Sequence, residues 1–349
     1  MTARIALAFT LLLALARLDA APIKPDEQVM FLPHVAAEQP DGRAALRIEA
    51  WVYEREPRRW LHWAFARYLR IDEKTMSDAE RALFRERTQL FRVDSERGKR
   101  VQIALPDGRR ALLPPTKADG RSSITLTIQP QDTAPWIEFS ALLPEGDTRH
   151  FQGRALRVPA RGWSVVSDID DTIKLSQVLD QRELLLNTFV RPFKPVPGMA
   201  PRYRQFAHED ADTRFHYVST SPLQLLPALS QFLSESGFPK GSMHLREATR
   251  WRDLLADDEG TASHKRHAIE HLLRTFPQRR FILIGDSGER DPEIYADLAR
   301  RFPDQIALIA IRRVDEADVA TRRNAVARDT GNVRWLWFDQ PASLSLPDI

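Results

Sequence analysis

The fold is decided by the stretch WSVVSDIDDTIKLSQV at residues 163–178, in which a strand-like apolar run ends in a group of carboxylates. Three acidic side chains, Asp168, Asp170 and Asp171, fall within four residues directly after that run. Crowding like charges is unfavourable unless a cation or a reaction compensates for it. The stretch therefore predicts a buried strand that leads into a functional loop.

The chain after residue 159 repeats one order of elements, a short apolar run followed by a helical stretch. The runs that predict strands are WSVVSD (163–168), FHYVS (215–219), FILIG (281–285), IALIAI (306–311) and WLWF (335–338). Helices are predicted at residues 222–236, 264–275 and 292–301. Such alternation is typical of a parallel sheet with helices on both faces. We therefore expect an α/β domain over residues 159–349.

The chain before residue 159 has a different pattern, in which apolar and polar residues alternate. The segments LRIEAWVYE (46–54), SSITLTIQP (122–130) and WIEFSALL (136–143) each place apolar side chains on one face. Period-two alternation with turn signals such as PDG between the runs predicts antiparallel strands, here a sandwich-like β domain over residues 22–158. A helical insert, at about residues 58–92, interrupts these strands.

The first 21 residues have the layout of a secretory signal peptide. They contain a basic residue at Arg4, an apolar run over residues 5–16 and small residues at Ala20 and Ala21. The apolar run is too short to span a bilayer, so we expect cleavage near Ala20 or Ala21 and a periplasmic or secreted protein. The alternative is an uncleaved membrane anchor.

Composition narrows the function classes. The sequence has no cysteine, which excludes disulfides, thiol catalysis and thiolate metal sites. The net charge is +3, and although arginine greatly outnumbers lysine, this balance does not indicate nucleic-acid binding. An anionic lipid surface remains compatible with it.

Polar residues follow three of the predicted strands at the point where each strand ends. Asp168 and Asp170 follow the first, Ser219 ends the second, and Asp286 follows the strand FILIG. The carboxyl ends of parallel strands line one crevice, to which a following helix adds the amine of Lys265. Carboxylates without imidazole or thiolate favour a hard cation, and Mg²⁺ uses one or two of them together with waters and a substrate phosphate.

The order of these signals, DIDDT (168–172), then Ser219, then Lys265, then GDSGERD (285–291), resembles the four motifs of the haloacid dehalogenase superfamily. Within it, NTFVRPFKPVPGMAPRYRQFA (187–207), HYVSTSPLQLLPAL (216–229) and GDSGERDPEIY (285–295) are similar to the catalytic domain of the actin-patch-protein type of phosphatidate phosphatase and its bacterial relatives. The resemblance covers residues 160–340 or so and implies a haloacid-dehalogenase-like Rossmannoid fold.

The resemblance also implies roles in a phosphoryl transfer. Asp168 would be the nucleophile that forms an aspartyl-phosphate, and Asp170 would protonate the leaving oxygen and then activate water. Ser219 and Thr220 would bind the phosphoryl group. Lys265 would supply positive charge to the aspartyl-phosphate, and Thr172 would orient the loop of the nucleophile.

The same resemblance implies a magnesium site. Its ligands would be the Asp168 carboxylate, the backbone carbonyl of Asp170 and Asp286. Asp291 would either ligate the metal or support Lys265. The implied reaction is Mg²⁺-dependent hydrolysis of phosphatidate to diacylglycerol and phosphate.

Two other functions stay open at this point. The protein could be a phosphatase for soluble or protein-linked phosphomonoesters, or a non-enzymatic envelope protein whose β domain binds a partner. Three histidines at helical spacing, His264, His267 and His271, lack the pattern of a zinc site, so we expect a solvated helix face. Residues 176–189 could form a lid. The short connection between the first two strands predicts a small helical insert that leaves the crevice accessible.

The segment RRWLHWAFARYLR (58–70) allows two interpretations. Trp60, Trp63, Phe65 and Tyr68 among arginines have the composition of a helix that lies at an anionic membrane surface. The same spacing also fits a helix packed on the core of the β domain, which is the interpretation we favour.

Overall fold

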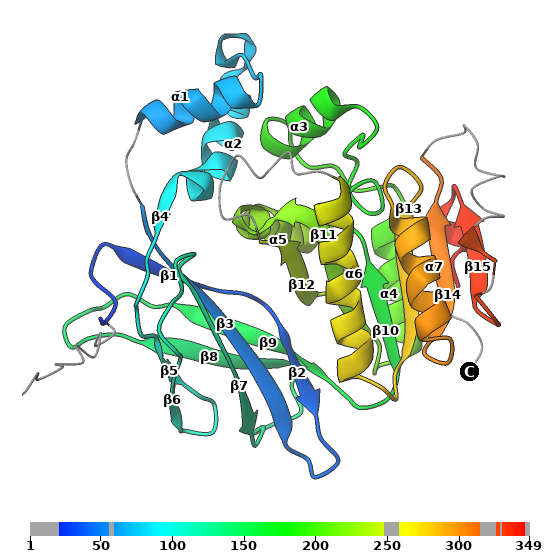
Figure 1. Ribbon diagram of the computed structural model, residues 1–349, viewed down its shortest axis with the longest axis horizontal. Helices are drawn as coiled ribbons and strands as arrows, with labels where there is room; N and C mark the ends of the chain where they lie inside the picture. The colour runs from blue at the N-terminus through cyan, green and yellow to red at the C-terminus, as the bar shows by residue number, and fades with distance from the viewer. Residues whose placement is uncertain (1–20, 56–58, 248–257, 315–325, 329, 346–349) are drawn as a thin grey trace, which may run out of the picture.

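The computed structural model of the protein describes residues 21–55, 59–247, 258–314, 326–328 and 330–345. Residues 1–20 of the predicted signal segment lie outside this range. Among the described residues, none of the helices has the length and apolar character needed to cross a bilayer. Two sheets, one from each half of the chain, organise the molecule (Figure 1).

The sheet of the C-terminal half has six parallel strands in the order β12-β11-β10-β13-β14-β15. Its strands are β10 (Trp163–Ser167), β11 (Arg214–Pro222), β12 (Gly241–Arg246), β13 (Arg280–Asp286), β14 (Ile306–Arg312) and β15 (Arg334–Phe338). All five predicted strands are confirmed, and β12 at the edge is the one that the prediction missed.

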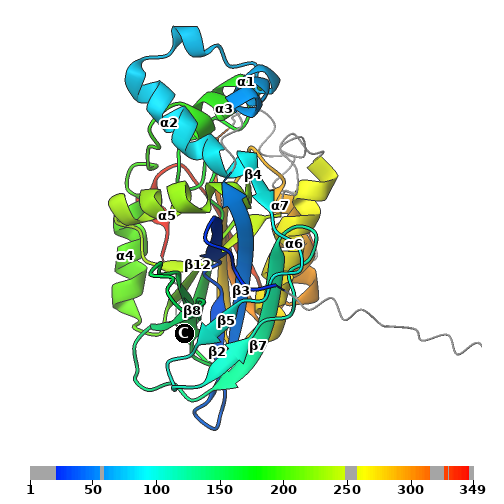
Figure 2. The ribbon, with the colours of Figure 1, turned by 90° about the vertical axis from the view of Figure 1, so that its left-hand side faces the viewer.

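Helices cover both faces of this sheet, as predicted. They are α4 (Met199–Glu209) and α5 (Leu226–Glu235) on one face and α6 (Asp258–Thr275) and α7 (Asp291–Arg301) on the other, while α3 (Gln181–Phe189) lies beyond the strand ends (Figure 1). Neighbouring residues of β10 point to opposite faces, so Val165 joins the core formed with α4 and α5, whereas Val166 joins the core formed with α6 and α7. Figure 2 shows the two helix pairs on opposite sides of the sheet. Burial on both faces explains why the strands are continuous apolar runs.

The N-terminal half forms a nine-stranded sheet, in the order β1-β3-β2-β9-β8-β5-β6, with β4 and β7 also paired to β3. Its strands are β1 (Glu27–Phe31), β2 (Val35–Glu38), β3 (Ala44–Arg55), β4 (Val93–Ser95), β5 (Gln102–Ala104), β6 (Arg110–Leu112), β7 (Arg121–Ile128), β8 (Trp136–Leu142) and β9 (Gln152–Val158). Pairing is antiparallel except between β2 and β9. Among the described residues, hydrogen bonds join these strands into one sheet, not the two separate sheets of a sandwich. Alternate residues of β3, such as Leu46 and Ile48, share one core with Ile137 and Phe139 of β8, which gives a sandwich-like packing.

The helical insert consists of α1 (Arg59–Tyr68) and α2 (Asp78–Thr88), and its buried face shares one hydrophobic cluster with residues of both halves of the chain. Phe65 of α1 stacks on Phe91 with ring centroids 5.2 Å apart, and both rings contact Phe189 of α3 at 5.7 Å. The favoured interpretation, packing on the core of the β domain, is therefore incomplete, because the insert reaches across to a helix of the C-terminal half. Figures 1 and 2 show α1, α2 and α3 together above one edge of the parallel sheet.

Candidate active site

Asp168 lies at the carboxyl end of β10 and is almost fully buried. Its backbone N–H donates to the carbonyl of Ile284 in β13 at 2.9 Å, which fixes the start of the loop. Lys265 Nζ donates to Asp168 Oδ1 at 2.9 Å, while Oδ2 accepts no hydrogen bond from the described residues. Burial, which disfavours the charged form, raises the pKa of Asp168 well above its usual value. Oδ2 of Asp168 is therefore available to bind another ligand or to attack a substrate.

Asp286 and Glu289 lie beside Asp168. Within the described part of the chain, these three are the group that offers carboxylate oxygens all within 4.8 Å of one another. Asp286 Oδ1 accepts the backbone N–H groups of Gly288 at 2.6 Å and of Glu289 at 3.1 Å, and Oδ2 accepts none. Burial first, and then the charges of Asp291 and Asp168, raise the pKa of Asp286 well above its usual value. The unpartnered Oδ2 atoms of Asp168 and Asp286, crowded beside Glu289, form a donor set that fits a hard divalent cation.

Asp291, which the sequence predicted as a metal ligand or a support of Lys265, is placed against the lysine. Its Oδ1 accepts from Lys265 Nζ at 2.5 Å, and its Oδ2 accepts the N–H of Asp286 at 3.3 Å. Gly285 permits this approach, because a Cβ there would come within 2.2 Å of Asp291 Oδ2. The geometry thus favours the support role over direct ligation.

Lys265 joins these carboxylates. Burial disfavours its charged form, yet the charges of Asp168, Asp291 and Glu289 raise its pKa well above the usual value. Its Nζ also donates to Glu289 Oε2 at 3.0 Å. The amine is therefore a fixed positive charge between the candidate nucleophile and the candidate metal ligands.

Asp170 is held by groups on both sides. Its Oδ1 pairs with Lys174 Nζ at 2.7 Å and accepts from Ser176 Oγ at 2.7 Å. Its Oδ2 accepts from Ser219 Oγ at 3.3 Å and from Ser221 Oγ at 3.0 Å. Burial raises the pKa of Asp170, but Lys174 and these hydrogen bonds outweigh it, so that the net shift is downward. Asp170 therefore contacts Ser219, as the positions of both residues at strand ends predicted. The role of the Asp170 backbone carbonyl as a metal ligand stays a prediction.

Asp171, the third acidic residue of the stretch after β10, shapes the loop. With φ of 50°, its carboxylate accepts the backbone N–H groups of Ser176, Gln177 and Val178 at 2.7–3.0 Å. Thr172 is fully buried, and its hydroxyl has no partner among the described residues. These contacts close the loop after β10 into a compact turn, so its side chains occupy defined positions.

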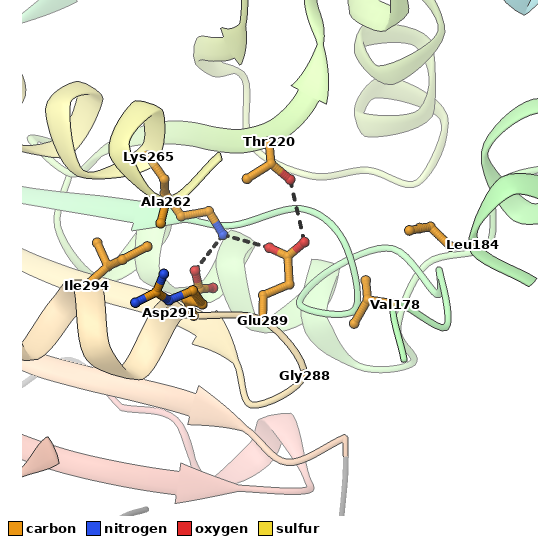
Figure 3. A pocket seen from close by; sticks show the side chains of 10 residues that line it. Val178, Leu184, Thr220, Ala262, Lys265, Gly288, Glu289, Asp291 and Ile294 are labelled. Atoms are coloured by element: carbon orange, nitrogen blue, oxygen red, sulfur yellow. Dashed lines mark hydrogen bonds and ion pairs between the residues drawn. The ribbon is translucent and has the colours of Figure 1, made fainter. Parts of the chain in front are cut away.

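A pocket of about 410 Å³ opens beside these groups (Figure 3). Thr220, Lys265, Glu289, Arg290 and Asp291 provide its polar lining, and its apolar lining is Val178, Leu184, Ala262 and Ile294. Thr220 Oγ1 and Glu289 Oε1 are 3.5 Å apart. The lining thus combines two cationic and two acidic side chains with an apolar side.

Glu289 and Lys174 are among the residues of the site that the sequence analysis did not identify. Glu289 lies in the motif GDSGERD (285–291), in which only Asp286 and Asp291 were predicted to be site residues. Lys174 follows the carboxylate group by three residues and is 1% exposed. A lysine next to an acidic cluster at the end of a buried strand was the available signal.

The remaining histidine prediction concerned α6. His267 and His271 are exposed, as a solvated face requires, and His264 is half-buried. Within the described residues, none of them belongs to a group placed to hold a metal ion.

Comparison with known proteins agrees with this geometry. Residues 163–313 match the family model described as Phosphatidate phosphatase APP1, catalytic domain. Phosphatidate phosphatase APP1 of Saccharomyces cerevisiae is 34% identical over 178 residues, which are 49% of this chain and 30% of that protein. An uncharacterized protein of Schizosaccharomyces pombe is 35% identical over 157 residues, 44% of this chain and 25% of that protein. The aligned part spans less than a third of either yeast protein. Residues 163–313 of this chain form an APP1-type catalytic domain.

Proposed function

We propose that the protein is an exported Mg²⁺-dependent phosphatidate phosphatase with haloacid-dehalogenase-type chemistry. The observation that carries the proposal is the unpartnered Oδ2 of Asp168, buried beside Lys265 and within the carboxylate group of Asp286 and Glu289. A carboxylate is a competent nucleophile toward phosphorus when neighbouring positive charge offsets the repulsion of the phosphate. The match to the APP1 catalytic domain supports phosphatidate as the substrate.

The first step transfers the phosphoryl group. An oxygen of Asp168 forms a bond to phosphorus as the ester P–O bond breaks, and the departing diacylglycerol oxygen takes a proton from Asp170. Lys174 favours the ionised form of Asp170 in the free protein. The negative charge of a bound phosphate opposes that effect and favours the protonated form.

The second step regenerates the nucleophile. Asp170, now ionised, takes a proton from water, whose oxygen attacks phosphorus and releases phosphate from Asp168. Lys265, which pairs with Asp168 at 2.9 Å in the free protein, would offset negative charge at this position. A Mg²⁺ ion held by Asp168, Asp286 and Glu289 would neutralise these carboxylates and the phosphate.

The test of this proposal is phosphate release from phosphatidate in mixed micelles, from glycerol 3-phosphate and from a phosphotyrosine peptide. We expect turnover of phosphatidate in Mg²⁺, none in excess chelator, and recovery when Mg²⁺ is restored. Faster release from the soluble ester or the peptide would favour the alternative phosphatase functions. Absence of release from all three would favour the non-enzymatic alternative. Protein recovered outside the cytoplasm with an N-terminus near Ala21 would support export.

The cluster of Asp168, Asp286 and Glu289 allows a prediction about the role of Glu289 in binding Mg²⁺. Glu289→Gln removes one anionic oxygen of the donor set, so we expect Mg²⁺ affinity to fall about 10-fold or more. Calorimetric titration of the protein with Mg²⁺ measures it without substrate. Glu235→Gln, at an exposed position of α5, should bind Mg²⁺ as the unaltered protein does. Equal affinity of the two variants would contradict the assignment of Glu289.

Contact with an anionic membrane is also part of the proposal. Trp63 of α1 is 63% exposed with Arg67 over its ring, whereas Phe65 is buried and Tyr68 is half-buried. The side chains of Arg58 and Trp60 lie outside the described residues. An exposed tryptophan beside an arginine suits the headgroup region of a bilayer.

We therefore expect the protein to co-sediment with phosphatidate-containing liposomes, and less so at high salt because screening weakens the attraction of arginine to headgroups. Trp63→Ala should reduce the bound fraction several-fold without altering turnover of a soluble ester. Replacing Leu112, an exposed leucine of β6 in the other half of the molecule, provides the control. Unchanged co-sedimentation of the Trp63→Ala protein would argue against this contact.

A further inference from the structure

A buried cation stands behind Asp170. Lys174 is 1% exposed, and its amine contacts Asp170 Oδ1 and Ser176 Oγ. The backbone of Lys174 is fixed as well, because its N–H donates to Ile169 and its carbonyl accepts from Asp171. These contacts hold the Lys174 amine against Oδ1 of Asp170 from a buried position.

Lys174 has an aromatic neighbour that it shares with an arginine of the other half of the chain. Its Nζ lies 5.0 Å from the centroid of the Phe193 ring, and the guanidinium carbon of Arg87 lies 3.6 Å from the same centroid. Phe193 in turn packs edge-on against Phe232 of α5 at 5.8 Å. Cations over an aromatic face are attracted to it, most strongly where water is excluded.

Arg87 of α2 is itself buried and anchored. Its Nη1 donates to the carbonyl of Thr188 at 3.0 Å and to that of Arg191 at 2.6 Å, at the carboxyl end of α3. Burial lowers the pKa of Arg87 to about 10, so the guanidinium stays charged at neutral pH. A cation at this end of a helix satisfies carbonyls that have no partner within the helix. Arg87 thus holds both α3, whose Leu184 lines the pocket, and the ring of Phe193.

We infer that the helical insert of the N-terminal half completes the active site, with Arg87, Phe193 and Lys174 acting as positioning residues for Asp170. This inference rests on the proposed function, since it assigns the insert a part in the proton transfer at Asp170. Removing the guanidinium of Arg87 or the ring of Phe193 should leave the Asp170 side chain free to turn away from the leaving oxygen. Small displacements of this kind lower the rate of the chemical step more than they weaken substrate binding.

The experiment uses two matched pairs in the full chain. Arg87→Leu is compared with Arg85→Leu, an exposed position of the same helix. Phe193→Leu, which removes the ring, is compared with Phe193→Tyr, which keeps it. For phosphatidate we expect kcat to fall about 10-fold or more in Arg87→Leu and Phe193→Leu, with KM within about twofold. Arg85→Leu should match the unaltered protein, and Phe193→Tyr should recover most of the loss.

A second measurement separates positioning from loss of folded protein. A nitrophenolate leaving group needs little protonation, so both damaging variants should lose less activity on nitrophenyl phosphate than on glycerol 3-phosphate. A purely structural defect would lower both rates equally. Equal losses on the two esters, or an unchanged kcat in both Arg87→Leu and Phe193→Leu, would overturn the inference. No phosphate release by the unaltered protein would instead overturn the proposed function.

Discussion

Asp168→Asn is expected to lower phosphatase turnover by roughly 10³-fold or more, because an amide cannot form the aspartyl-phosphate. The substitution is nearly isosteric, and the amide oxygen can still accept from Lys265 Nζ. Burial already disfavours the charged carboxylate of Asp168, so removing that charge should not weaken the fold. We expect the thermal midpoint to stay the same or rise.

The measurement is single-turnover phosphate release together with a thermal unfolding curve of the same preparation. Asp304→Asn, at an exposed position before β14, makes the same chemical change away from the site and should leave turnover unchanged. The unaltered protein should also trap label from a ³²P-labelled substrate in an acid-stable, base-labile form. Near-normal turnover by folded Asp168→Asn protein would rule out the nucleophile assignment.

Acidification is expected to destabilise the protein through buried histidines between its two sheets. His216 in β11 is fully buried, with Nδ1 2.7 Å from Ser242 Oγ and Nε2 3.3 Å from Ser164 Oγ. Burial, and then the charges of Arg279 and Arg214, lower the pKa of His216 to about 3. His34, which approaches Glu49 at 2.8 Å, also has its pKa lowered to about 3, by burial and by nearby arginines.

The direction of this pH effect follows from comparing the protonation of the histidines in the folded and the unfolded chain. At pH 7 these imidazoles are neutral in both the folded and the unfolded chain. As the pH falls below about 6.5, the unfolded chain takes up protons that the folded protein does not. Each histidine then reduces the free energy of unfolding by about 1.4 kcal/mol per pH unit, until the pH approaches the folded pKa near 3.

Urea unfolding between pH 7.5 and pH 5 measures this loss. A His216→Gln variant lacks one titrating group, so its free energy of unfolding should change with pH less steeply than that of the unaltered protein. His267→Gln, which changes an exposed histidine of α6 in the same way, is the matched control. Parallel slopes for all three proteins would show that His216 takes up its proton in the folded state.

The amino-acid sequence by itself determined the parallel sheet and its helices. Strands buried on both faces must be continuously apolar, and β10, β11, β13, β14 and β15 were all visible for that reason. Because parallel strands end at one edge, the positions of Asp168, Ser219 and Asp286 at strand ends were enough to predict that they would gather. Local pattern and a general rule of topology carried these predictions.

Only the tertiary structure decided which partner each charged group takes. Asp291 and Glu289 stand two residues apart and both accept from Lys265, but the turn after β13 places Glu289, and not Asp291, with Asp168 and Asp286 in the group that could hold a metal ion within the described residues. Side-chain direction in a turn depends on backbone angles and on contacts with other elements, which residue order does not encode locally.

The position of the helical insert could likewise not be predicted from the local pattern of residues. The spacing of aromatic residues in α1 predicted a buried face, but it could not say what covers that face. Phe65 meets Phe189, and Arg87 meets Phe193, across more than a hundred residues of intervening chain. Apolar burial is non-directional, so the sequence determines that a face must be covered, and only the packing of the whole chain determines that α3 covers it.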